Sequence, residues 1–228
     1  KSYFKIIKVK KYILSKNYNW KLFALIATGA AALAIAIGIG RFSYTPILPY
    51  MLEELNLSKT NGGLIASWNF FGYLFGSLIT ILPIFKNRVK LFFLTAVIIS
   101  LLTTLLMAFN NDIIIFILIR FLAGVSSAFV LIFGTALILP SIQAFGKKSL
   151  STSHFMGVGF GIVFSSILIS ILGSLGFIWN ELWIGVSILS LILAIPIFIY
   201  TPNEIILSTP NKISKSTSTF GFSLITIS

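Results

Sequence analysis

The chain has 228 residues, of which 57% are hydrophobic and only 10% are charged, and its formal net charge is +12. This composition excludes an ordinary soluble domain, in which about a quarter of the residues are charged, and indicates an all-α polytopic membrane protein. The chain has no cysteine, which excludes disulfides and thiolate metal sites.

The N-terminal segment, residues 1–21, is basic. It holds seven lysines interleaved with aromatic and aliphatic residues, and it does not begin with Met, so we expect the chain to start inside a longer reading frame. The pattern is typical of a solvated cytoplasmic flank, or of an amphipathic segment that lies on an anionic membrane face. A signal peptide cleaved near residues 34–36 is disfavoured, because the basic stretch is long and further spans follow.

The first predicted membrane helix is the uncharged run 22–40, long enough at about 1.5 Å per residue to cross most of a hydrocarbon core of about 30 Å. It ends in the motif GIGRFSYTPILP, which contains Arg41. A guanidinium inside a membrane is costly, so we expect Arg41 to face protein or a watery cavity. Pro46 and Pro49 each remove a backbone donor and predict a kink or a stop at this point.

Five further helices follow from the remaining uncharged runs, with turn residues between them. The expected ranges are 60–85, 91–111, 113–139, 154–175 and 182–200. The domain organisation is therefore a basic segment at 1–21, a six-helix bundle at 22–200, a polar linker at 201–218, and the start of a truncated seventh helix at 219–228. A complete six-helix protein with a frayed tail is the alternative for this last segment.

The basic residues predict the orientation. With a cytoplasmic N-terminus, fourteen of the seventeen lie in inside segments and only Lys59 lies outside, while Arg41 and Arg120 fall within helices. The positive-inside rule therefore predicts that both termini of the bundle are cytoplasmic. The large positive charge is thus a topology signal and gives no reason to expect a nucleic-acid partner.

Three motifs carry a resemblance to a known family. GIGRFSYTPILP, the run Trp68 to Gly76 (WNFFGYLFG) and the run Arg120 to Ala128 (RFLAGVSSA) together resemble the YbfB/YjiJ-type group of the major facilitator superfamily. The resemblance implies the N-terminal half of a 12-helix fold, built as two inverted three-helix repeats, with a missing C-terminal six-helix half. It also implies that the first and fourth helices line a transport pathway and that the protein lies in the bacterial cytoplasmic (inner) membrane.

The expected pathway residues combine the two buried arginines with neighbouring aromatic and amide side chains, namely Arg41, Tyr44, Trp68, Asn69, Tyr73 and Arg120. Both arginines fall in the outer half of their helices, and a planar guanidinium suits a carboxylate or carbonyl partner. An arginine that binds backbone carbonyls at a kink is the alternative for each. Trp68, Asn69, Tyr44 and Tyr73 suit a mid-sized organic ligand, and packing roles remain an equal alternative for them.

Glycines spaced every four residues indicate close helix packing. These are Gly72 and Gly76 on the second helix, Gly124 on the fourth, and Gly157 and Gly161 on the fifth.

The expected function is a secondary active transporter that moves a small organic solute, anionic if the arginines bind it, by alternating access. Protons are one option for the coupling ion, and no cofactor or metal is expected. A sensor or assembly subunit without transport activity is the alternative. An enzyme is not expected: Gly124-Val125-Ser126-Ser127 approaches the motif of rhomboid proteases but lacks its final glycine, and His154 is predicted too far away to act as a base.

Overall fold

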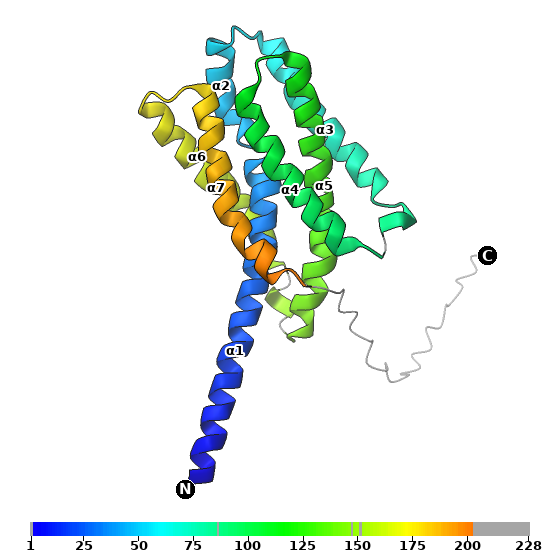
Figure 1. The fold of residues 1–228 in the computed structure, drawn as a ribbon, viewed down its shortest axis with the longest axis vertical. Helices are drawn as coiled ribbons and strands as arrows, with labels where there is room; N and C mark the ends of the chain where they lie inside the picture. The colour runs from blue at the N-terminus through cyan, green and yellow to red at the C-terminus, as the bar shows by residue number, and fades with distance from the viewer. Residues whose placement is uncertain (1, 86, 147, 151, 203–228) are drawn as a thin grey trace, which may run out of the picture.

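The computed structural model describes residues 2–85, 87–146, 148–150 and 152–202, with side chains from Tyr18 onward except that of Lys148. Within these residues the chain is helical throughout, and six segments are long and apolar enough to cross a membrane (Figure 1). We number them spans 1 to 6: Tyr18–Glu54, Lys59–Ile79, Val89–Phe109, Ile113–Ala144, Ser153–Ser174 and Trp179–Tyr200. The predicted six-helix class is confirmed.

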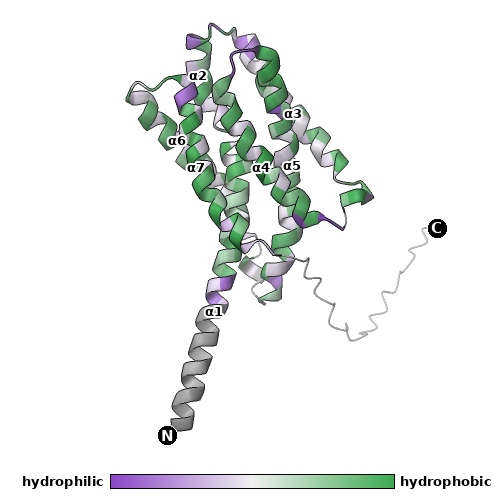
Figure 2. Cartoon of the chain, in the orientation of Figure 1, coloured by the Kyte–Doolittle hydropathy of each residue, from purple (hydrophilic) through white to green (hydrophobic). Residues whose placement is uncertain are grey.

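The helical elements follow the spans closely. Span 1 comprises α1 (Ser2–Leu33) from Tyr18 onward, the π-helix η1 (Ala34–Ile39) and α2 (Tyr44–Glu54). Span 2 is α3 (Lys59–Ile79), span 3 is α4 (Val89–Leu106) with the 3-10 turn η3 (Met107–Phe109), and span 4 is α5 (Ile113–Ala144). Span 5 is the 3-10 turn η5 (Ser153–Phe155) with α6 (Met156–Ser174), and span 6 is α7 (Trp179–Tyr200). Two further 3-10 turns, η2 (Pro83–Phe85) and η4 (Lys148–Leu150), lie in connections. Hydrophobic residues cover the bundle, and hydrophilic residues gather at its two ends (Figure 2).

Span 1 is longer than predicted. It does not end at Gly40: after a turn the chain resumes as α2 and continues to Glu54. Pro46 lies in the first turn of α2, where a helix needs no backbone donor, so it starts the new helix instead of stopping the old one. Pro49 lies past the first turn, in the interior of α2.

Other boundaries also shift for local reasons. The second span ends at Ile79, and the residues expected to complete it form the separate turn Pro83–Phe85. The fourth continues through Pro140 to Ala144, since a proline near a helix end removes a single hydrogen bond. Asp112 caps this helix by accepting from the backbone N–H groups of Ile114 and Ile115.

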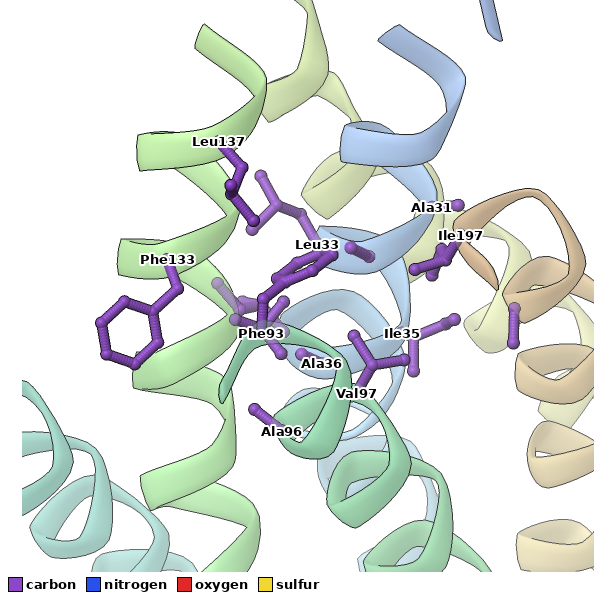
Figure 3. Packing of buried hydrophobic residues seen from close by; sticks show 14 of the residues in the cluster. Ala31, Leu33, Ile35, Ala36, Phe93, Ala96, Val97, Phe133, Leu137 and Ile197 are labelled. Carbon is purple, nitrogen blue, oxygen red and sulfur yellow. The ribbon is translucent and has the colours of Figure 1, made fainter. Parts of the chain in front are cut away.

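Span 1 forms the centre of the bundle. Its apolar side chains pack with those of α4, α5 and α7, and Figure 3 shows Leu33, Ile35 and Ala36 against Phe93 and Val97. Because lipid tails are as apolar as these side chains, the contacts stabilise the bundle through close packing more than through removal of water.

The helix pairing has an internal symmetry. α3 packs on α5, and α6 packs on η1 and α1; likewise α4 packs on α5, and α7 packs on α1. If spans 1, 2 and 3 are exchanged for spans 4, 5 and 6, the α3–α5 pair becomes the α6–α1 pair, and the α4–α5 pair becomes the α7–α1 pair. α3 and α6, which exchange in this way, lie at opposite sides of the bundle (Figure 1). The fold is therefore two three-helix repeats, as the family resemblance implied.

Candidate functional site

The break in span 1 is the most irregular backbone within the bundle. In the π-helix Ala34–Ile39, backbone hydrogen bonds join residues five apart instead of four. The N–H of Gly40 donates to Ile35 O at 2.8 Å, and that of Phe42 donates to Ile37 O at 3.3 Å. A π-turn followed by a new helix leaves carbonyl groups at the junction without the usual partners one turn later. The carbonyls of Gly40 and Arg41 accept hydrogen bonds from a side chain instead.

Arg120 of α5 supplies these bonds. Its Nη1 donates to Gly40 O at 2.8 Å and its Nη2 to Arg41 O at 3.1 Å, and the residue is only 3% exposed. The guanidinium carbon also lies 4.7 Å from the ring centroid of Tyr44. These contacts match the alternative given for Arg120, an arginine that binds backbone carbonyls at a kink, and its loss would leave two carbonyl acceptors without a donor.

Tyr44 and Asn69 link the break in span 1 and Arg120 to α3. We call this group of residues the polar centre. The Tyr44 hydroxyl donates to Gly62 O at 2.9 Å, and Asn69 Nδ2 donates to Arg120 O at 3.0 Å. Both residues are buried. Each bond crosses between spans, so the break in span 1, α3 and α5 are held together by polar contacts within the apolar bundle.

Arg41 points toward α3. It is half-buried, and its guanidinium carbon lies 4.3 Å from the ring centroid of Phe70 and 4.8 Å from that of Tyr73. Such cation–π contacts hold a guanidinium in a fixed place without neutralising its charge. Phe70 was not predicted, although its position three residues before Tyr73 puts both rings on one helix face.

Several buried polar atoms around the break make no hydrogen bond with the described residues. They are Arg41 Nε, Ser43 Oγ, Asn69 Oδ1, Arg120 Nε and Trp183 Nε1. Trp183 is fully buried on α7, with its ring 6.5 Å from that of Tyr44. Buried polar atoms are usually satisfied, so this concentration of unpaired atoms, mostly donors, indicates a place where water or a solute binds.

The comparisons with known proteins bear on the same region. The family model described as "Uncharacterised MFS-type transporter YbfB" matches residues 33–226, which include the whole of this centre. The chain belongs to this family of MFS transporters. No curated protein and no solved structure matches it.

Membership of the YbfB-type family makes the chain a multi-pass membrane protein of a transporter family, with a fold consistent with half of the MFS architecture. The structure brings together five of the six residues expected to line the pathway of this family member, namely Arg41, Tyr44, Asn69, Tyr73 and Arg120. Trp68 lies apart from them, with its ring at 5.4 Å from that of Phe71 and 6.1 Å from that of Phe121. Trp183 gave no signal in the sequence, because it lies in a helix that is apolar almost all round.

The glycines of the YbfB-type chain lie at two helix crossings related by the internal symmetry. A Cβ at Gly72 would lie 2.1 Å from Phe121 O, and one at Gly124 would lie 2.1 Å from Asn69 O. At the other crossing, a Cβ at Gly157 would lie 1.9 Å from Ala30 O. Gly76 and Gly161 make similar approaches to Val125 and to Ala34. These crossings bring backbones so close that no larger residue fits without a shift of the helices.

The serines and the histidine considered for catalysis have structural surroundings of their own. Ser127 Oγ donates to Gly124 O in its own helix, and Ser126 bonds both Ala123 O and Ser100. His154 is buried at the start of the fifth span, beside Gly29 of α1. Among the described residues there is no cluster of three or more side chains that could hold a metal ion.

Proposed function

We propose that this YbfB-type protein is a secondary active transporter that moves a small organic anion across the membrane by alternating access. Arg41, Tyr44, Asn69, Tyr73 and Arg120 contact the solute in this proposal, with Trp68 farther along the pathway. The observation that carries it is the group of buried donors without partners, Arg41 Nε, Arg120 Nε and Trp183 Nε1, at the break in span 1.

Charge favours an anion. The two guanidiniums are positive, and the four acidic residues in the described part of the chain all lie at span ends: Glu53, Glu54, Asp112 and Glu181. A carboxylate on the solute would supply the missing countercharge, and the planar fork of arginine suits it well. A neutral amide of the same shape would gain much less.

The same bonds suggest how binding could change the conformation. Arg120 holds two carbonyls at the junction between η1 and α2. A solute carboxylate that competes for this guanidinium would release those carbonyls and let the two pieces of span 1 move relative to each other. Broken helices at mid-membrane serve this role in other transporter folds.

The setting of this activity is also proposed. The distribution of basic residues favours a cytoplasmic N-terminus and gives no reason for a nucleic-acid partner. The family resemblance favours a bacterial inner membrane. The bundle at 22–200 would work together with a second six-helix half through the linker at 201–218 and the helix expected at 219–228, and these last segments lie almost wholly outside the described residues. Protons are the coupling ion to test first.

One observation favours the alternative, a sensor or assembly subunit without transport. Both terminal nitrogens of Arg120 are already bonded to backbone, which is what a purely structural arginine would do. The two functions differ in what Arg41 does, since its guanidinium contacts aromatic rings that a solute could share.

Uptake and efflux of labelled carboxylates and their matched amides, measured in cells that express the protein, test the proposal. We expect movement of at least one carboxylate but not of its amide, and loss of that movement in Arg41→Gln at normal membrane levels. Lys59→Gln, a change of an exposed lysine at the far end of α3, is the matched control. Equal movement of acid and amide, or full activity in Arg41→Gln, would exclude an anion pathway through this centre.

A further inference from the structure

A cleft lies at the opposite end of the bundle from Glu53, Glu54, Asp112 and Glu181, the acidic residues in the described part of the chain. Its volume is about 210 Å³, and its lining includes Trp20, Lys21, Ala24, Phe145 and Tyr200. These residues come from α1 and from the ends of α5 and α7, which α1 passes in Figure 1. Lys21 is the charged side chain in this lining, and it is exposed.

Aromatic side chains at this end of the bundle indicate the depth of the lipid headgroups. Trp20 is 55% exposed, and Tyr18 and Tyr200 are each 41% exposed, all three at this end of the bundle. Tryptophan and tyrosine gather where membrane meets water, because their rings are apolar and their N–H or O–H groups need polar partners. The exposed apolar side chains farther along the same helices therefore face lipid tails, and the cleft opens beside the headgroups.

The negative ends of the neighbouring helices are capped. The Tyr18 hydroxyl donates to Phe145 O at the end of α5, and Lys90 Nζ donates to Thr201 O, just past α7, at 3.3 Å. Carbonyl groups at a helix C-terminus otherwise repel anions. With these groups bonded, the described surface around the cleft is positive, because Glu53, Glu54, Asp112 and Glu181 all lie at the other end.

We propose that this cleft binds the phosphate headgroup of an anionic phospholipid, with Lys21 as its charge partner and Trp20 and Tyr200 beside the glycerol. The volume fits a headgroup and not a drug-sized solute, which needs roughly 300 Å³ or more. The acyl tails stay in the bilayer. Basic sites between helices at the membrane surface recognise anionic lipids in this way. This site is separate from the polar centre and does not depend on its function.

Native mass spectrometry of the purified chain tests the site. The protein in detergent is titrated with phosphatidylglycerol or, separately, with phosphatidylcholine of the same acyl chains. We expect the first phosphatidylglycerol to bind more tightly than phosphatidylcholine, and Lys21→Gln to weaken it about fivefold, the effect of one lysine near a charged membrane surface. Lys59→Gln, which removes an exposed lysine at the other end, should leave the affinity unchanged.

A second pair of variants separates the cleft from general attraction to the lysines of residues 1–21. Trp20→Ala should weaken phosphatidylglycerol binding without a change in charge. Phe198→Ala removes another exposed ring at the same end of the bundle, 49% exposed and outside the cleft lining, and should have no effect. Equal binding by Lys21→Gln and Lys59→Gln, or by Trp20→Ala and Phe198→Ala, would overturn the proposal.

Discussion

Replacing Arg120 with Gln should destabilise the protein, because the side chain holds the break in span 1. The change removes two hydrogen bonds to backbone carbonyls and a contact with the Tyr44 ring. Side-chain hydrogen bonds between membrane helices are worth about 0.6 kcal/mol on average and up to about 1.7 kcal/mol, and a desolvated cation–π contact is worth about 2 kcal/mol. We therefore expect a loss of roughly 3–5 kcal/mol in the free energy of unfolding.

Reversible unfolding of the purified protein in mixed micelles, titrated with dodecyl sulfate and followed by circular dichroism, measures this loss. Arg120→Lys should recover about half of it, since an ammonium keeps the charge but cannot donate to both carbonyls in the same plane. Arg41→Gln is the control: the Arg41 guanidinium contacts aromatic rings at a half-exposed position, and these contacts are worth about 0.5–1 kcal/mol. If Arg120→Gln is no less stable than Arg41→Gln, the guanidinium does not hold the break.

Three further predictions follow from the fold and the site. Arg41→Gln should reach the membrane at normal levels yet lose solute movement, with partial rescue by Arg41→Lys; misfolding of the Gln variant with normal movement by its folded fraction would assign the arginine a structural role. Gly72→Ala should cost about 1–3 kcal/mol in the same unfolding assay, because the new methyl meets Phe121 O, whereas Gly63→Ala, with nothing within 4 Å, should not; equal stability would mean that the crossing relaxes. A cysteine at Asn56 should react with an impermeant reagent added outside intact cells and one at Arg88 should not, and the reverse pattern would invert the predicted orientation.

The sequence alone determined the number of spans and, except for span 1, their approximate ends. Hydropathy and charge are local properties of the chain, and a membrane converts a run of about twenty apolar residues into a helix with little help from the rest of the fold. The four-residue spacing of Gly72, Gly76, Gly157 and Gly161 was equally visible, because a small residue repeated on one helix face has few other uses in a membrane. The motifs around Arg41 and Arg120 were enough to suggest the family.

Only the tertiary structure decided what those arginines touch. The partners of Arg120 are carbonyl groups, which every residue carries, and they became acceptors because η1 winds as a π-helix and α2 starts anew at Tyr44. No residue type signals that geometry. Trp183 joined the centre for a similar reason: α7 is apolar on nearly every side, so the pattern along the chain does not say which side of that helix meets a neighbour.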